Sequence, residues 1–133
     1  MPESNFNTNK EYILLDAIRS WTGSPLIGDD CALLPGGLLA SVDTLVENVH
    51  FSLDTTDFVS LGFKALAVNI SDIAAMAGRP RHALVSITLP DYVIKRNLES
   101  LYQGLNQSAR AYKVKIAGGD LSRGTLLSIS ITI

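Results

Sequence analysis

The chain has 133 residues, of which 47% are hydrophobic and 18% charged, a balance that predicts one globular domain. Its formal net charge is -2 and it contains no lysine or arginine run, so neither nucleic acid nor a membrane surface is an expected partner. The single cysteine, Cys31, excludes an internal disulfide and makes the cytoplasm the expected location.

The N-terminal third predicts a helix followed by two extended segments. Residues 1–9 are polar, lack the order of a signal peptide and are expected to be irregular. Apolar residues at helical spacing over 12–21 predict a helix, which Gly23 ends. Residues 26–37 predict a loop, a short strand and a turn, and residues 38–46 predict a second strand.

The remaining two thirds alternate between helices and strands. Asp57 is expected to cap a helix that runs to about Ala77, and polar residues interrupt its apolar stretches, so no membrane span is predicted. Further patterns predict a strand over 83–89, an amphipathic helix over 92–112, a short strand over 114–117 that ends at Gly-Gly-Asp, and a strand over 126–133.

The order of these elements, α-β-β-α-β-α-β-β, favours an α+β fold in which helices pack on one face of a mixed β-sheet. The last strand pattern has no terminating turn, so we expect the chain to be part of a longer protein. Residues 1–133 are therefore interpreted as one domain.

Two aspartate positions in the first third stand out. Asp29 and Asp30 follow Gly28, and two adjacent carboxylates repel each other unless a cation or hydrogen-bond donors compensate, although a solvated turn is the simpler interpretation. Asp43 interrupts an apolar strand, two residues after Ser41, so both side chains point to one face. A hydroxyl and a carboxylate suit Mg²⁺, but an edge strand open to solvent has the same pattern.

Two further aspartates lie in the second half. Asp72 is the only carboxylate in an alanine-rich helix. It shares one side of this helix with Asn69, which could orient it, although an ordinary solvent-exposed helix face has the same pattern. Asp120 follows Gly118 and Gly119, whose backbone could approach phosphate oxygens, although Gly-Gly-Asp is also a common turn.

If the fold gathers these aspartates, their mutual repulsion calls for divalent cations, and a glycine-rich segment beside several Mg²⁺ ions describes a nucleotide-phosphate site. No P-loop and no protein-kinase motif set is present. His50 is either a surface histidine or a contact to a substrate phosphate. Tyr102 is either a core residue or a stacking partner for adenine.

Four motifs together resemble the thiamine-monophosphate kinase family, in its order and approximate spacing. They are Gly-Asp-Asp-Cys-Ala-Leu-Leu over 28–34, the segment Ser-Val-Asp-Thr-Leu-Val-Glu-Asn-Val-His-Phe over 41–51, the helix over 64–78, and Gly-Gly-Asp-Leu-Ser-Arg-Gly over 118–124. The resemblance covers the chain from about residue 10 onward. It implies the aminoimidazole ribonucleotide synthetase-like fold and ATP-dependent phosphorylation of thiamine monophosphate to thiamine diphosphate.

The resemblance also implies roles for individual residues, and none of them is catalytic beyond metal binding. It implies a homodimer formed through the sheet, with ATP near the subunit boundary and several Mg²⁺ ions. The implied magnesium ligands are Asp29, Asp30, Ser41, Val42 (through its carbonyl), Asp43, Asp72 and Asp120. The implied nucleotide contacts are Tyr102, Gly118, Gly119 and Asp120, and the implied contact to thiamine monophosphate is His50.

Two departures from the family pattern affect these expectations. Asn48 stands where the family often has glycine, so the local turn is expected to differ. Members of the family are about twice as long, so a C-terminal domain is expected to be missing and this chain alone to be weakly active or inactive. The alternatives are another enzyme of the superfamily, such as aminoimidazole ribonucleotide synthetase, and a non-catalytic dimerisation module.

Overall fold

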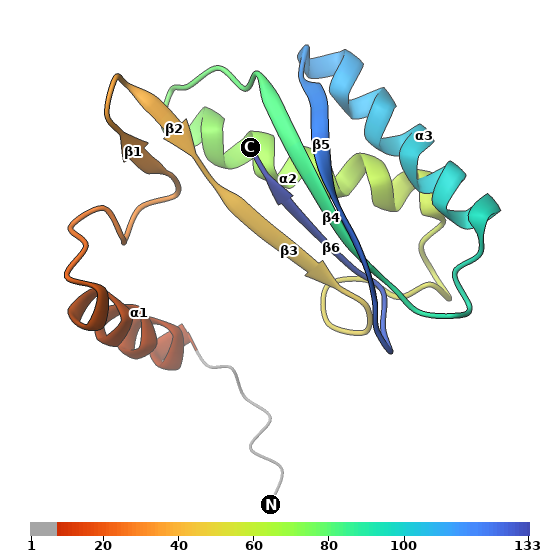
Figure 1. Ribbon diagram of the computed structural model, residues 1–133, viewed down its shortest axis with the longest axis horizontal. Helices are drawn as coiled ribbons and strands as arrows, with labels where there is room; N and C mark the ends of the chain where they lie inside the picture. Colours follow the sequence, from red (N-terminus) through yellow and green to blue (C-terminus); the bar gives the residue numbers. More distant parts are fainter. Residues whose placement is uncertain (1–7) are drawn as a thin grey trace, which may run out of the picture.

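The computed structural model describes residues 8–133 (Figure 1), so residues 1–7 of the predicted irregular start lie outside it, while Thr8 and Asn9 already belong to the first helix. The elements in chain order are α1 (Thr8–Thr22), β1 (Ala32–Leu34), β2 (Leu38–Ala40), β3 (Val42–Val46), α2 (Phe58–Ala75), β4 (His82–Leu89), α3 (Lys95–Tyr112), β5 (Lys115–Arg123) and β6 (Ser128–Thr132).

Four strands form the main sheet, in the order β3-β6-β4-β5. Strands β4 and β5 run parallel, and both neighbours of β6 run antiparallel to it, so the sheet is mixed, as the sequence predicts. Strands β1 and β2 form a separate antiparallel hairpin. The edges of the main sheet are therefore β3 and β5.

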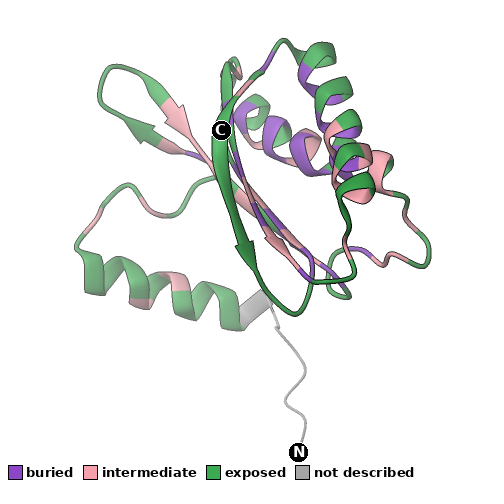
Figure 2. Ribbon diagram, turned by 45° about the vertical axis from the view of Figure 1, so that its right-hand side comes forward, coloured by how far each residue is buried: buried purple, intermediate pink, exposed green. Residues whose placement is uncertain are grey.

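Helices α2 and α3 cover one face of this sheet and enclose the core (Figure 2). The apolar residues of β6 that the alternation predicts to face one way, Ile129 and Ile131 among them, are buried against these helices. Ser128 and Ser130 point to the other face, which no helix covers in the described part of the chain. The α+β fold with helices on one face is confirmed.

Glycines allow α2 and α3 to pack with their backbones in contact. A Cβ atom on Gly62 would lie 2.0 Å from the Leu101 carbonyl oxygen, and one on Gly104 would lie 1.8 Å from the Val59 carbonyl oxygen. By length and composition alone α2 would pass as a membrane span, with a mean hydropathy of 1.4. Its buried leucines and isoleucines pack in the core, which accounts for this hydropathy.

Helix α2 begins where its cap predicts. The Asp57 carboxylate accepts hydrogen bonds from the Ser60 backbone N–H at 2.8 Å and from the Ser60 hydroxyl at 2.7 Å. The chain leaves the helix through Ala77, whose φ is 55°, and the N–H of Gly78 donates to the Ile73 carbonyl at 2.9 Å. The predicted cap at Asp57 is confirmed.

Three predicted boundaries are corrected by the structure. The strand expected over 38–46 is divided at Ser41 into β2 and β3. Helix α3 starts at Lys95, three residues later than expected. The strand expected to end at Gly-Gly-Asp continues as β5 to Arg123, and a Cβ atom on Gly119 would lie 1.7 Å from the Val85 carbonyl oxygen, so Gly119 permits close pairing with β4.

Candidate metal and phosphate site

Three side chains meet where β3 begins beside α2. Asp43 pairs in register with Ile131, whose side chain is buried under the helices, so the Asp43 carboxylate also points to the helix-covered side. The Ser41 hydroxyl lies 3.3 Å from Asp72 Oδ2 and 3.2 Å from the Asp30 carbonyl oxygen, and it can donate to one of them at a time. Asp30 and Asp72, which are 42 positions apart in sequence, thus both supply oxygen atoms next to the Ser41 hydroxyl.

Electrostatic repulsion acts between the two carboxylates of this cluster. Burial raises the pKa of Asp43 above its ordinary value. The negative charge of Asp72 and a hydrogen bond to it raise this pKa further, and the nearby His50 lowers it. Cys31 is buried behind the cluster, where its thiol donates to the Asp72 carbonyl at 3.3 Å. Burial, followed by the charge of Asp72, raises the pKa of Cys31, which keeps the thiol neutral.

Asp29 and Asp30 lie beside this cluster on the loop that follows α1. The Asp29 carboxylate accepts a hydrogen bond from the Asp30 backbone N–H at 2.8 Å, and both residues are exposed. Arg19 of α1 donates to the Ile27 carbonyl from Nε at 2.9 Å and from its terminal nitrogen at 2.6 Å, which ties the loop to the helix. A Cβ atom on Gly28 would lie 2.0 Å from Arg19, so glycine leaves room for this contact.

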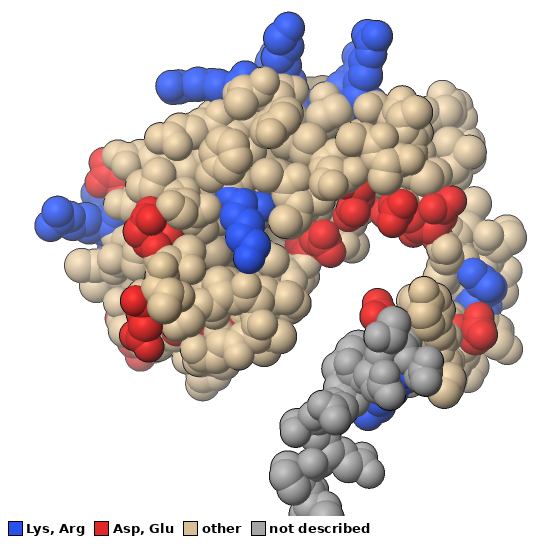
Figure 3. Space-filling model, turned by 180° about the vertical axis from the view of Figure 1, so that it is seen from behind, with Lys and Arg blue, Asp and Glu red and all other residues tan. Residues whose placement is uncertain are grey.

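The loop and the start of β3 border a hollow that separates them from α1. Figure 3 shows acidic side chains side by side along its rim. The cavity measures about 690 Å³ and is lined by Asp29, Asp30, Ser41 and Val42 on one side and by Tyr12 of α1 on the other. A polyphosphate chain entering this cavity would meet the acidic oxygens only through cations, because anions and carboxylates repel.

His50 lies on the turn that follows β3, with its imidazole held in one orientation. The Val46 backbone N–H donates to His50 Nδ1 at 2.9 Å, so in the neutral ring the proton is on Nε2, which is free to donate. Lys64 of α2 donates to the His50 carbonyl at 3.2 Å. Asn48 has a φ of 63°, a left-handed conformation that asparagine tolerates, which explains how it can stand at a glycine position.

Asp120 does not join the cluster within one chain. It pairs with Ser86, so it points to the open face of the sheet, whereas Asp43 points to the helix side. Strands β3 and β5 are at opposite edges, three strand spacings or about 14 Å apart. Asp120 lines a separate cavity of about 320 Å³ on the open face, with Gly119, Ser86 and Ser130. The five aspartates therefore do not all converge in a single copy.

Two other predicted residues occupy structural environments. Tyr102 packs against the core, and burial raises the pKa of its hydroxyl; its role as a nucleotide contact stays a prediction. Asn69 is buried and its Nδ2 donates to the Ala65 carbonyl at 2.9 Å, within its own helix. No hydrogen bond joins Asn69 to Asp72 in the described structure, so the expectation that it orients this carboxylate finds no support.

One buried charged residue was not singled out from the sequence. Glu47, directly after β3, is 8% exposed and accepts hydrogen bonds from the Leu127 backbone N–H at 2.9 Å and from the Tyr92 hydroxyl. The available signal was an acidic residue directly after the apolar pair Leu45 and Val46, three positions before His50.

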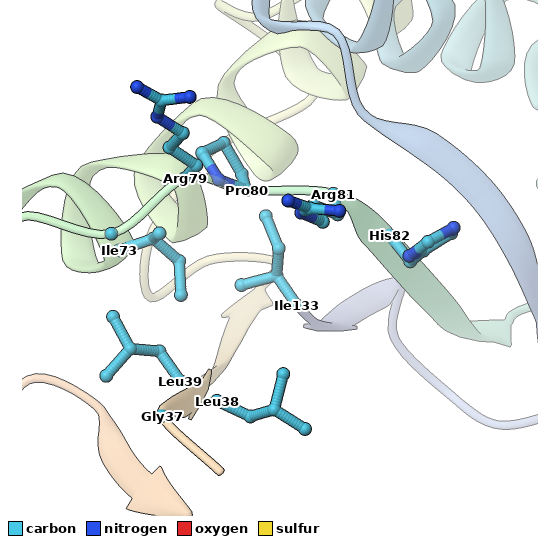
Figure 4. Close-up of a pocket in the computed structure, with 10 residues that line it drawn as sticks. Gly37, Leu38, Leu39, Ile73, Arg79, Pro80, Arg81, His82 and Ile133 are labelled. Atoms are coloured by element: carbon cyan, nitrogen blue, oxygen red, sulfur yellow. The ribbon is translucent and has the colours of Figure 1, made fainter.

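A third cavity, of about 600 Å³, lies between β2 and the connection from α2 to β4 (Figure 4). Leu38, Leu39 and Ile73 line one part of it. The guanidinium of Arg79 points away from these apolar side chains, and Arg81 and His82 lie on another side. The basic groups do not converge on one point, so this cavity is not a comparable site.

The donor set at Asp43 and Asp72 suits magnesium. Over residues 8–133, no three side chains of histidine, cysteine, aspartate or glutamate come together as a preformed metal cage. Mg²⁺ typically takes one or two carboxylates and keeps several waters or binds substrate phosphates. Two carboxylates and the Ser41 hydroxyl, with the Asp30 carbonyl beside them, match that preference, and the repulsion on Asp43 is what a bound cation would relieve.

Comparison with known proteins yields one family. Residues 28–133 match the model of the AIR synthase related protein family, N-terminal domain. The chain is 42% identical over 112 residues to the thiamine-monophosphate kinase of Bacillus subtilis (80% of this chain, 34% of that protein). It is 42% identical over 136 residues to that of Haemophilus influenzae (99% of this chain, 40% of that protein). The chain thus spans between about a third and two fifths of the length of these relatives.

Solved structures give the same result. A structure of AaThiL complexed with AMPPCP and TMP superposes with a TM-score of 0.89 at 32% identity, over 98% of this chain and 43% of the other. Thiamine monophosphate kinase from Aquifex aeolicus superposes with a TM-score of 0.82 at 33% identity, over 92% of this chain and 41% of the other. A HypE–HypF complex superposes with a TM-score of 0.76 at 17% identity, over 95% of this chain and 41% of the other, which shows a shared fold alone.

Proposed function

Because this chain belongs to the family of AIR synthase related proteins, we propose that it is the metal- and nucleotide-binding domain of a kinase that converts thiamine monophosphate to thiamine diphosphate with ATP. The observation that carries the proposal is the meeting of Asp43, Asp72 and Ser41 beside His50. The curated relatives named above are thiamine-monophosphate kinases, and AaThiL binds AMPPCP and TMP, which supports the choice of both substrates.

The reaction moves the terminal phosphoryl group of ATP onto a phosphate oxygen of thiamine monophosphate. The acceptor is already an anion, so no strong general base is needed, and the main obstacle is repulsion between two anions. Magnesium, when bound, would supply positive charge that neutralises the phosphates. Several Mg²⁺ ions are proposed, with Asp30, Ser41, the Val42 carbonyl, Asp43 and Asp72 as ligands and Asp29 beside them.

The residues of this chain orient the phosphates around that charge. Asp43 and Asp72 extend from β3 and α2, two elements that pack in the core, so their separation is fixed by the fold. His50 can donate a hydrogen bond from Nε2 to the phosphate of thiamine monophosphate, because Nδ1 is already occupied by the Val46 N–H. Positioning and charge complementarity, rather than a nucleophilic side chain, are the proposed sources of catalysis.

A homodimer would bring Asp120 to the other aspartates. The open face of the sheet carries Val42, Leu84 and several hydroxyl side chains, and Val42 is 61% exposed. If two sheets close into a barrel with β3 of one chain beside β5 of its partner, Asp120 of one chain lies next to Val42 and Asp43 of the other. ATP would then bind at the subunit boundary, with Gly118, Gly119 and Asp120 as contacts.

The proposal also covers the rest of the protein and its location. The curated relatives are more than twice as long as this chain, so we assign further metal, ATP and thiamine contacts to a C-terminal domain of the complete protein. We propose a cytoplasmic location, and weak or no activity for this domain by itself.

The test is a kinase assay on the complete polypeptide that contains this domain. With thiamine monophosphate, ATP and Mg²⁺, thiamine diphosphate is expected to form, and Asp72→Asn is expected to reduce kcat at least about a hundredfold, as loss of a charge-stabilising group does. Glu99→Gln, an exposed change on α3, is the matched control and is expected to keep full activity. Absence of product in the unaltered protein would refute the proposed function.

A further inference from the structure

Glu47 is a buried carboxylate whose role the phosphate site does not explain. Among the described residues it is the only aspartate or glutamate that is buried. Its Oε2 accepts two hydrogen bonds, one from the Leu127 backbone N–H at 2.9 Å and one from the Tyr92 hydroxyl. The hydrogen bond to Glu47 also raises the pKa of Tyr92, which keeps this phenol a donor at neutral pH.

These two contacts join three separate segments at one end of the sheet. Glu47 directly follows β3, Tyr92 lies between β4 and α3, and Leu127 directly precedes β6. The backbone N–H of Glu47 donates to the Leu127 carbonyl at 2.9 Å, so Glu47 and Leu127 exchange two hydrogen bonds. Glu47 is therefore held from both its backbone and its side chain.

The turn that follows Glu47 is the one that carries His50. The Asn48 N–H donates to the Phe51 carbonyl at 2.8 Å, and the His50 N–H donates to the Val46 carbonyl at 2.9 Å. Since the imidazole Nδ1 accepts from the Val46 N–H, the ring orientation depends on the path of residues 46–50. Glu47 is the second residue of that path and anchors it to two neighbouring segments.

Burying a carboxylate is unfavourable, and an apolar residue of similar volume at such a position is often neutral or stabilising. A role in stability alone therefore accounts poorly for glutamate here. The carboxylate does offer one oxygen atom that can accept both the Tyr92 hydroxyl and the Leu127 N–H, which fixes the direction in which the turn leaves β3.

We propose that Glu47 and Tyr92 are positioning residues that hold the His50 imidazole in the orientation in which Nδ1 accepts from the Val46 N–H and Nε2 carries the proton. The consequence for substrate binding rests on the proposed function, since it requires that His50 contacts the phosphate of thiamine monophosphate. The orientation of the ring itself does not depend on that function, so the two can be tested separately.

The orientation is tested by nitrogen NMR of the 133-residue chain, with His82, the other histidine, as the internal reference. The unaltered chain is expected to show His50 mainly as the Nε2–H tautomer. Glu47→Ala is expected to shift His50 toward a mixture of tautomers, and Glu47→Gln, whose amide oxygen can accept the same two hydrogen bonds, is expected to restore it. His82 is expected to be unchanged in each variant.

Tyr92→Phe keeps the test decisive if Glu47→Ala fails to fold, because it removes one hydroxyl from a residue that is 52% exposed. Tyr112→Phe is its matched control, since Tyr112 is 46% exposed at the end of α3. In the complete enzyme Tyr92→Phe is expected to raise KM for thiamine monophosphate about fivefold, the effect of one hydrogen bond, with KM for ATP unchanged.

An unaltered His50 spectrum in both Tyr92→Phe and a folded Glu47→Ala would overturn the positioning role. Equal increases in KM for both substrates would also contradict it, since a general loss of structure predicts that result. If the complete protein shows no kinase activity, the proposed function fails, and the NMR comparison still decides whether Glu47 and Tyr92 orient His50.

Discussion

Replacing Asp43 by asparagine is expected to stabilise the metal-free protein. The folded-state pKa of Asp43 is raised, so its ionised form is disfavoured in the fold, and the free energy of unfolding is lowered at pH values above that pKa. Stability should therefore rise as the pH falls through the folded-state pKa of Asp43. Asparagine removes the charge at nearly the same volume and removes this unfavourable term at neutral pH.

The size of the effect follows from the repulsion between Asp43 and Asp72. Two like charges about 4 Å apart repel by about 4 kcal/mol at an effective dielectric constant of 20 and by about 1 kcal/mol in bulk water. Both side chains are only partly buried, so solvent screening favours the lower part of that range. We expect Asp43→Asn to add about 1–2 kcal/mol, or roughly 3–6 °C in Tm for a domain of this size.

Thermal unfolding in EDTA and in Mg²⁺ measures this effect. In EDTA the variant is expected to melt above the unaltered chain. Mg²⁺ at ten times its Kd is expected to stabilise the unaltered chain by about 1.4 kcal/mol and the variant much less. Glu99→Gln removes the same charge far from the cluster and is expected to match the unaltered chain. Equal melting of all three proteins in EDTA, with equal stabilisation by Mg²⁺, would refute the electrostatic reasoning.

Two further predictions concern the packing and capping that place the site. Gly104→Ala is expected to lower the free energy of unfolding by about 3 kcal/mol, because the new methyl group collides with the Val59 carbonyl. Chemical denaturation measures this change, with Asn106→Ala as a control at an exposed position of the same helix. A change below about 1 kcal/mol would contradict the close contact between α2 and α3. Asp57→Ala is expected to lower Tm at pH 7, because it removes the hydrogen bonds that Asp57 accepts from Ser60. These hydrogen bonds lower the pKa of Asp57, so the stability that they provide is lost when Asp57 is protonated. The difference in Tm between the variant and the unaltered chain should therefore shrink as the pH falls. A difference between Asp57→Ala and the unaltered chain that is independent of pH would contradict the second prediction.

The sequence predicts most of this fold because its local signals agree with the tertiary structure. The cap at Asp57, the alternation in β6 and the spacing in α1 each identify an element with little help from the rest of the chain. The sequence predicts that β5 ends before Gly118 because glycine usually weakens a strand, whereas Gly119 is required by the close approach of β4. That requirement depends on residues more than thirty positions away and cannot be read locally.

The candidate site is predicted in part for the same reason. Strand periodicity places Ser41 and Asp43 on one face, and the structure confirms that they meet Asp72. The sequence does not separate Asp120 from them, because spacing along the chain gives no information on strand order, and β5 lies at the far edge of the sheet. The importance of Glu47 depends on Tyr92 and Leu127, which the sequence does not connect to it.

The most direct test of a site shared between subunits is activity complementation in the complete enzyme. Asp43→Asn and Asp120→Asn are each expected to be inactive as homodimers. In a heterodimer, one site carries both substitutions and the other carries neither, so unfolding and refolding an equal mixture is expected to restore about one quarter of the activity of the unaltered enzyme. If the mixture stays inactive while its subunits do exchange, Asp43 and Asp120 do not act in one site across the subunit boundary, and the proposed arrangement is contradicted.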